Sequence, residues 1–283
     1  LCFYLIACCA ARAGARAHSE QRDGLRVVRE YADAMIERGR DVYGKVHSPL
    51  FAVTLDRRTL RLPTSDPPGI SGIRKDDRTL TGANPMHDLN LYQTLYALTR
   101  ITGEKRYAAA ADEALKWFLE HCQSPATGLL AWGEHLGWDF NTESPLAGRV
   151  YAQDVHEMYR PWVLWTKCSQ LAPQACQRFA LGLWRHQIAD HQTGNFSRHA
   201  HYSKHDPRLR REYPRHGGFY ISIWAAAYEQ SKDPELLQAI KVLVSSFEKR
   251  RDPTTGALPL QSGGVLARQM WPYSNLGLAI DLW

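Results

Sequence analysis

A repeated pattern of paired helices is the feature that most constrains how this chain can fold. Apolar residues recur at helical spacing in two adjacent runs, a short break separates the runs, and a Thr-Gly pair follows the second run. The pairs are Thr127-Gly128, Thr193-Gly194 and Thr255-Gly256, and successive pairs lie 66 and 62 residues apart. A period of this length is typical of stacked helical hairpins. The pattern therefore predicts an all-α fold.

Three helical hairpins are predicted from this pattern. They cover residues 91–122, 158–187 and 219–247, with short breaks at 102–104, 171–173 and 232–234. A further apolar run at 274–283 predicts the first helix of another hairpin. A closed ring of six hairpins with this period needs more than the 283 residues of the chain. We therefore expect an incomplete (α/α) toroid of helical hairpins that is truncated at its C-terminal side.

The segment before the first hairpin departs from the repeat. An amphipathic helix is predicted over residues 25–36, and the region 41–77 is rich in Pro and Gly. Within that region, 51–55 and 59–62 have the pattern of a short β-hairpin. We expect a β-hairpin or long loop inserted near the N-terminus of a single domain that spans residues 18–283.

Residues 1–17 are predicted to be an export signal that is incomplete at its N-terminal side. Leu1 to Ala11 is apolar and uncharged, and the small-residue pattern Ala15-Arg16-Ala17 follows. The apolar run is too short to span a bilayer, so no transmembrane segment is expected. An alternative is a lipoprotein signal, in which Cys8 carries a lipid anchor. In either case we expect an exported protein, periplasmic or extracellular.

Three cysteines remain after the signal, and export would allow them to form disulfides. Cys168 and Cys176 are close enough in sequence to pair. All three, including Cys122, lie on apolar helical faces, which favours buried thiols.

The charge balance predicts an anionic partner. Lys and Arg number 35 and Asp and Glu 29, which gives a net charge of +6, and twelve histidines add positive charge at mildly acidic pH. The excess is small and dispersed, and no basic run with interleaved aromatic residues marks a nucleic-acid groove. A phosphate-binding glycine loop is also absent from the sequence.

Long segments between the hairpins carry the residues that suggest chemistry, as loops on a rigid scaffold often do. The first contains Trp132, Glu134, His135, Trp138 and Asp139, and the second contains Arg198, His199, His201, Tyr213, Arg215 and His216. His87 lies at the entrance to the first hairpin, and Asp88 beside it is predicted to cap the helix. Because these segments all lead into the first helix of a hairpin, we expect them at one rim.

The helical hairpins, the export signal and this aromatic, acidic and histidine-rich rim resemble the (α/α) toroid enzymes that act on carbohydrates. That superfamily includes six-hairpin glycosidases and polysaccharide lyases of uronic-acid polymers. The strongest local string runs from Thr127 to His135. The resemblance implies a glycan substrate, and it assigns neither a single family nor a catalytic residue.

Two mechanisms fit such a rim. A glycoside hydrolase needs two carboxyl groups that flank the scissile bond. Glu134 and Asp139 supply one pair, and Asp88, Asp154 or Glu157 could complete another. A lyase needs a group that neutralises a uronate carboxylate, a base that removes the C5 proton and an acid that protonates the leaving oxygen.

The density of Arg, His and Tyr in the second long segment favours a polysaccharide lyase that acts on an anionic polysaccharide or oligosaccharide. The predicted catalytic residues are Glu134, His135, His199, Tyr213, Arg215 and His216, and the predicted substrate-binding residues are His87, Trp132, Trp138, Asp139, Arg198 and His201. A glycoside hydrolase is the first alternative. A non-catalytic helical-repeat scaffold that binds glycan or protein is the second, although its loops would be shorter and more alike.

No cofactor or metal is expected from the sequence. His199, His201 and His205 lie close together, but their spacing matches neither a helical zinc site nor a cysteine-containing finger. Zinc or calcium therefore stays a lesser alternative.

Overall fold

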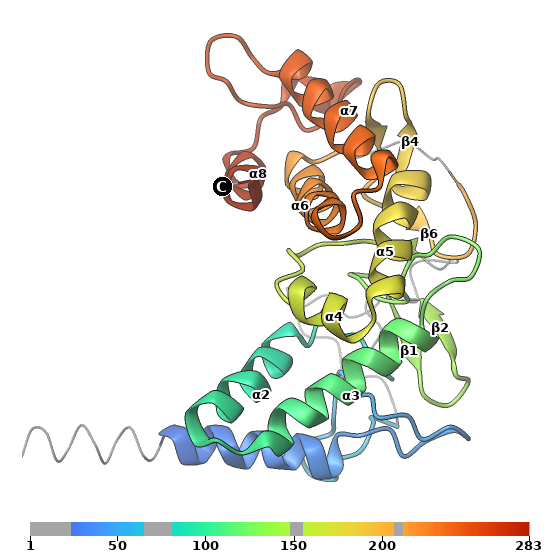
Figure 1. The fold of residues 1–283 in the computed structure, drawn as a ribbon, viewed down its shortest axis with the longest axis vertical. Coiled ribbons are helices and arrows are strands. Elements are labelled where there is room, and N and C mark those ends of the chain that lie inside the picture. The colour runs from blue at the N-terminus through green and yellow to red at the C-terminus, as the bar shows by residue number, and fades with distance from the viewer. Residues whose placement is uncertain (1–23, 65–80, 148–154, 207–211, 283) are drawn as a thin grey trace, which may run out of the picture.

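A computed structural model describes residues 24–64, 81–147, 155–206 and 212–282 (Figure 1). The predicted export signal, including Cys8, lies outside these residues, as does Asp154. The described part of the chain is predominantly helical, with strands of only two to four residues.

Three helical hairpins follow one another along the chain. They are α2 (Leu89–Thr102) with α3 (Lys105–His121), α4 (Trp165–Leu171) with α5 (Pro173–Gly182), and α6 (Pro214–Ser231) with α7 (Pro234–Arg250). Helix α3 contacts α4, α5 contacts α6, and α8 (Pro272–Leu282) packs against α6. In Figure 1 the hairpins are stacked one above the other, from α2 and α3 at the bottom to α6 and α7 at the top. The all-α prediction of stacked helical hairpins is confirmed.

The recurring Thr-Gly pairs close the same turn three times. The glycine N–H donates to the carbonyl four residues earlier, in the pairs Gly128–Ser124, Gly194–Asp190 and Gly256–Asp252. Each of these glycines has a positive φ, between 72° and 75°. A residue with a Cβ is disfavoured in that conformation, so the sequence repeats Gly where the turn repeats.

The second hairpin begins later than the sequence pattern predicts. Helix α4 begins at Trp165, whereas the apolar spacing begins at Met158. Residues 155–157 are extended because they pair with neighbouring segments, and Pro161 disfavours a helical conformation at the residue before it. A turn of π-helix (Leu183–Gln187) then extends α5 toward the next strand.

In the described segments between the hairpins, six short strands form three separate antiparallel pairs. They are β1 (Leu136–Asp139) with β2 (Ser144–Ala147), β3 (Val155–His156) with β6 (Ala200–His201), and β4 (Ile188–Asp190) with β5 (Asn195–Phe196). The β3–β6 pair joins the two long segments that carry the predicted site residues. A 3₁₀ turn (Val265–Arg268) precedes α8.

The N-terminal part is one helix over residues 24–38 followed by a long loop, which is one of the two forms expected there; the other form, a β-hairpin over residues 51–62, is not adopted. The backbone N–H groups of Ala52 and Val53 donate instead to Gly39 and Gly82, which are distant from the expected partner strand. The Asp56 carboxylate accepts hydrogen bonds from Arg58 N and Thr59 N and folds the intervening residues into a turn.

Buried aromatic residues fill the space between the hairpins. Trp132 is 1% exposed and lies 4.7 Å from Trp162 and 5.6 Å from Phe179, measured between ring centroids. The free thiols Cys122, Cys168 and Cys176 are buried as well, which confirms the prediction of unpaired core cysteines. Among the described helices, none has the length and apolar character that a membrane span requires.

Candidate active site and metal centre

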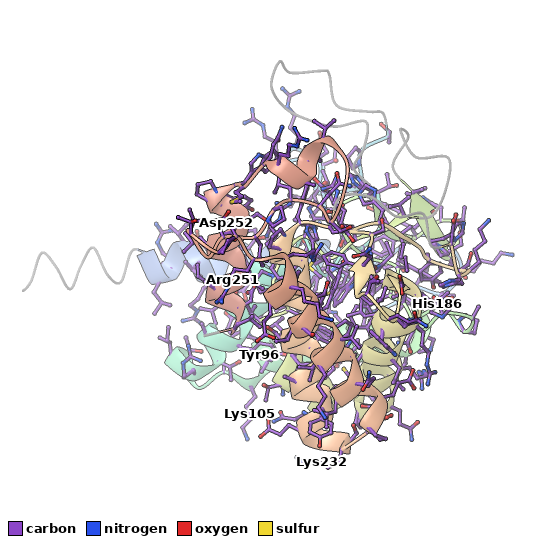
Figure 2. All side chains as sticks on the ribbon, turned by 90° about the horizontal axis from the view of Figure 1, so that it is seen from above. Tyr96, Lys105, His186, Lys232, Arg251 and Asp252 are labelled. Atoms are coloured by element: carbon purple, nitrogen blue, oxygen red, sulfur yellow. The ribbon has the colours of Figure 1, made fainter. Side chains whose placement is uncertain are left out.

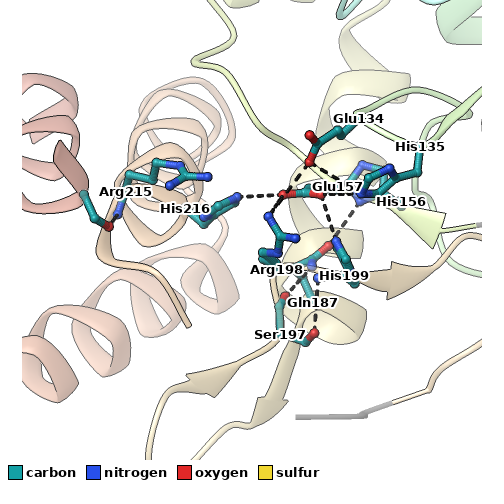
Figure 3. Close-up of polar contacts among 11 residues, drawn as sticks. Glu134, His135, His156, Glu157, Gln187, Ser197, Arg198, His199, Arg215 and His216 are labelled. Carbon is teal, nitrogen blue, oxygen red and sulfur yellow. Dashed lines mark hydrogen bonds and ion pairs between the residues drawn. The ribbon is translucent and has the colours of Figure 1, made fainter. Parts of the chain in front are cut away.

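One buried carboxylate, Glu157, lies at the centre of the predicted site residues (Figure 3). Its Oε2 is 2.9 Å from Nε2 of His199 and 3.3 Å from Nε2 of His135. Its Oε1 is 3.0 Å from Nε2 of His216 and 3.1 Å from Nη1 of Arg198. Glu157 is fully buried, so these four side chains replace the water that the carboxylate would otherwise bind.

The strand pairs explain why these residues meet. In the β3–β6 pair, Val155 is opposite His201 and His156 is opposite Ala200. The same antiparallel register brings the residue after β3, Glu157, close to the residue before β6, His199. A bridge from Gly133 to Glu157 brings in the segment that carries His135, which directly precedes β1.

Gly133 is required where this bridge forms. Its φ is +131°, and a Cβ at this position would lie 2.3 Å from the carbonyl oxygen of Glu157. Helix α6 supplies the last member of the cluster, because His216 lies in its first turn.

Glu157 is held in its charged form. Burial alone would raise the pKa of its carboxyl group, but the hydrogen bonds from His135, His199 and His216 hold that pKa well below its ordinary value. Burial in turn lowers the pKa of His216 to about 4, although Glu157 opposes the shift. His216 is therefore neutral near pH 7, and its Nε2–H donates to Glu157.

Burial also lowers the pKa of His199, against the opposing effect of Glu157. A neutral imidazole can bind a metal through a deprotonated nitrogen. His156 behaves like His216, with a pKa lowered to about 4 by burial and a hydrogen bond of 3.1 Å between Nδ1 and Oε1 of Gln187. Gln187 also donates to the carbonyl of Ser197, so it braces the backbone beside Arg198.

The side chains of His135, Glu157 and His199 can hold a metal ion. Each offers one ligand atom, and the three atoms lie within 4.8 Å of one another. Ligands that are about 2.0–2.2 Å from an ion have to be roughly 3–3.5 Å apart, as the carboxylate oxygen is from both imidazoles. Two imidazoles and one carboxylate are ligands that suit divalent transition metals. The carboxylate of Glu134, 3.4 Å from His135 Nε2, adds a second negative charge beside this group.

An aromatic and cationic cluster adjoins Glu157. Arg198 and Arg215 lie over the ring of Tyr213, at 5.4 and 5.2 Å from its centroid, and Tyr213 is 5.9 Å from His216. Arg215 also lies over the ring of Tyr273. Two guanidinium groups beside a partly exposed phenol can meet an anionic ligand.

The structure brings most of the predicted site residues together and separates others from them. The side chains of His135, Arg198, His199 and His216 contact Glu157 directly. Glu134 and Tyr213 contact these neighbours, and Arg215 contacts Tyr213. The predicted role of Trp132 in substrate binding is wrong. Its side chain is packed in the core, so it offers no ring face to a ligand.

Asp139 and Trp138 have structural contacts. The Asp139 carboxylate accepts from Asn141 N and Thr142 N at 2.9 and 2.7 Å, so it closes the turn after β1. Trp138 packs against Trp117 and pairs through its backbone with Ala83. These contacts give both side chains structural roles, and their predicted part in substrate binding stays a prediction.

His87 and His201 lie beside the central group. The ring of His87 packs on Tyr159 at 5.2 Å. His201 is on β6, next to the residue that pairs with His156, and its Nδ1 accepts from Ser203 N. Their predicted role in substrate binding stays a prediction.

The central position of Glu157 is what the sequence did not predict. It was only one of several carboxyl groups that could complete a pair. The available signal was a His-Glu pair directly before the second apolar run, but it identifies a centre only once the pairing of β3 with β6 is known.

Comparison with known proteins identifies a matching family, and a distantly similar solved structure is among those found. The family model described as periplasmic pectate lyase matches residues 70–219, which is more than half of the chain. A solved glycoside hydrolase of family 105 from C. acetobutylicum ATCC 824 is 14% identical, with a TM-score of 0.41. The match covers 74% of this chain and 60% of that protein.

Proposed function

Because the chain belongs to the periplasmic pectate lyase family, we propose that it cleaves an anionic, uronic-acid-containing polysaccharide by β-elimination. The reaction centre is the group around Glu157. The observation that carries the proposal is a buried carboxylate held by three histidines and an arginine, beside a second arginine and a tyrosine. This set, with Glu134 beside it, supplies the positive charge and the proton-transfer groups that elimination from a uronate requires.

A divalent cation held by His135, Glu157 and His199 would neutralise the uronate carboxylate and so acidify the C5 proton. Contrary to the expectation from the sequence, we therefore include a metal in the proposal. The chain's own part in holding the ion is to keep Glu157 ionised and the His199 imidazole neutral, which the lowered pKa values of these two groups favour.

Arg198 is the side chain best placed to meet the reacting sugar. It contacts Glu157 at 3.1 Å and Glu134 at 3.9 Å, and 12% of its side chain is exposed. Its guanidinium can pair with the substrate carboxylate while it stays anchored to Glu157. Tyr213 is half-buried and Glu134 keeps 11% of its side chain exposed, whereas Glu157 is fully buried, so we assign the proton transfers to Tyr213 and Glu134.

The glycoside hydrolase alternative has less support. Glu157 is fully buried among cations and histidines, and Asp139 is occupied in a turn. Neither carboxyl group can flank a glycosidic bond opposite Glu134, as a hydrolase would require.

The family description supports the periplasm as the location. We propose that residues 1–17 are the export signal that directs the chain there. A lipid anchor at Cys8 remains the lesser alternative.

The test is to incubate the purified protein with polygalacturonate and a divalent cation. We expect an unsaturated product that absorbs in the ultraviolet, and no product from neutral galactan. Reducing ends without that absorbance would contradict the lyase proposal and favour hydrolysis.

Two Arg→Lys variants test whether Arg198 takes part in the reaction. Arg198→Lys should lower kcat/KM by about 10²–10³-fold, because lysine keeps the charge but loses the forked guanidinium contacts. Arg185→Lys is the matched control, since Arg185 pairs with Glu235 at the surface. Equal activity of the two variants would exclude Arg198 from the reaction.

A further inference from the structure

A groove beside α7 carries positive charge that the proposed reaction does not use. Its volume is about 610 Å³, which is within the usual range for ligand sites. The groove lies between the outer side of α7, the turn from β4 to β5 and the loop after α7. In Figure 2, Lys232 and Arg251 mark the two ends of α7.

The lining of the groove suits an anionic carbohydrate. Among the described residues that line it, three are cations, Lys241, Lys249 and Arg250, and none is Asp or Glu. Seven of the eleven lining residues are neutral and polar, with hydroxyl or amide groups such as those of Asn195 and Ser245. Hydroxyl and amide groups can exchange hydrogen bonds with sugar hydroxyls, and the cations can pair with carboxylates.

The cations differ in how they are held. Arg250 donates to the buried Glu212 at 3.4 Å, while its own Nε is buried and finds no partner among the described residues. Lys241 and Lys249 are exposed. In the part of the chain that the structure describes, neither forms an ion pair with an acid. Two lysines are therefore available to a ligand.

The spacing of the lysines selects a ligand with repeated charges. Lys241 and Lys249 are eight residues apart on one helix, which separates them by about 12 Å along its axis. A single phosphate cannot contact both, whereas a chain of uronate residues carries one carboxylate on every sugar. Single-stranded nucleic acid also has repeated charges, but the described lining residues include no aromatic side chain that could stack with a base.

We propose that this groove is a second, non-catalytic binding site for a short uronate oligosaccharide. The proposal does not depend on the reaction at Glu157, because the groove can bind such a ligand whether or not the chain cleaves it. Strand β5 links the groove to the reaction centre. Its residue Asn195 lines the groove, and its residue Phe196, whose N–H donates to Glu212, is three residues before His199. A uronate polymer held in the groove would stay close to the segment that carries Arg198.

The experiment measures the binding of trigalacturonate by calorimetry in the Arg198→Lys background, which limits turnover. In the double variant Lys241→Gln with Lys249→Gln, one class of binding sites should show a Kd at least tenfold higher or should be lost. Arg250 is left unchanged because Glu212 ties it to the fold. The matched control is Lys105→Gln with Lys116→Gln, on exposed parts of α3.

Neutral galactotriose should not bind to the groove, and added salt should weaken the binding of trigalacturonate. Unchanged binding in the Lys241 and Lys249 variant would overturn the proposal. Displacement by an equal concentration of inorganic phosphate, or tighter binding of a six-residue oligothymidylate, would overturn the assignment to a uronate chain.

A rate measurement separates this proposal from the proposed function. With Arg198 intact, the double lysine variant should cleave trigalacturonate at the wild-type initial rate, because neither lysine touches the reaction centre. Absence of an unsaturated product from the wild type would contradict the lyase activity and leave the binding result to decide on the groove.

Discussion

Asp88 shows how a single residue can serve a different purpose from the one its position suggests. It lies directly before α2, but its side chain makes no capping hydrogen bond. Its Oδ2 is buried, with no hydrogen-bond partner among the described residues. Burial raises the pKa of this carboxyl group to about 8, and nearby Arg160 opposes the shift only in part. Asp88 is therefore predominantly protonated at neutral pH in the folded protein.

This shift predicts a pH dependence of stability. The pKa of Asp88 is higher in the folded state than in the unfolded state, so the folded state binds more protons between about pH 4 and pH 8. The free energy of unfolding therefore falls progressively as the pH rises from about 4 to about 8, and Asp88 has no such effect below that range. Asp88→Asn removes the ionisation, so its stability relative to the wild type should increase with pH by up to about 1.4 kcal/mol per unit.

Urea unfolding at pH 5, 6, 7 and 8 measures this difference. Asp56→Asn is the control, because hydrogen bonds from Thr59 and Arg58 lower the pKa of the exposed Asp56, and its ionisation is complete in this range. A difference between Asp88→Asn and wild type that stays constant from pH 5 to pH 8 would contradict the shift.

At the residue scale, the sequence predicts which side chains have chemistry that suits the site. It predicts their orientation less well. The density of His, Arg and Glu in two segments predicted His135, His199 and His216, and all three contact Glu157. The same reasoning placed Trp132 in the site, but its ring packs into the core. The orientation of a side chain in a short strand depends on pairing between distant segments, which residue types alone do not specify.

At the scale of elements, the bridge between Gly133 and Glu157 offers a direct test. A Cβ on residue 133 would meet the carbonyl oxygen of Glu157 at 2.3 Å, and φ is +131°. Gly133→Ala should therefore lower the free energy of unfolding by about 1–3 kcal/mol and displace Glu157, so that activity is lost as well. Gly103→Ala is the control: φ is +78° and nothing lies within 4 Å of its Cβ, so it should destabilise without loss of activity in the folded fraction.

Denaturant unfolding and the kcat of the folded fraction decide between these outcomes. If Gly133→Ala keeps full activity while it is destabilised, the bridge does not position Glu157. If neither property changes, the close approach of the two segments is wrong.

Elements that depend on local signals were predictable, and those that depend on distant pairing were not. The Thr-Gly turns repeat because the same backbone hydrogen bond and left-handed glycine recur, and they separated the hairpins correctly. Helix α4 begins later than expected because residues 155–157 pair with other segments. Of the two forms expected at 51–62, a β-hairpin or a long loop, the loop is adopted for the same reason, since the backbone N–H groups of Ala52 and Val53 donate to other segments.

At the scale of the whole molecule, the candidate centre joins segments that the helical repeat keeps apart. His135 follows the first hairpin, Glu157 precedes the second, and His199 precedes the third. The repeat predicted that these connections would meet, because each leads into the first helix of a hairpin. Their convergence on one carboxylate means that an ion at this centre would crosslink three parts of the fold.

A metal ion bound by these residues should therefore stabilise the whole molecule. An ion that binds only the folded state at a concentration of one hundred times its Kd adds about 2.7 kcal/mol to the free energy of unfolding. We expect the midpoint of thermal unfolding to fall when a chelator removes the ion and to recover when Mn²⁺ or Zn²⁺ is added in excess.

His199→Gln should lose most of this response, because it removes one ligand while Glu157 keeps its other partners. His121→Gln, an exposed histidine on α3 that stacks on Trp117, should respond like the wild type. Two outcomes would contradict the prediction: a wild-type midpoint that does not respond to chelator or metal, or an equal response in His199→Gln. Either would mean that no ion links the three segments. Neutralisation of the substrate carboxylate would then depend on Arg198 and Arg215 alone.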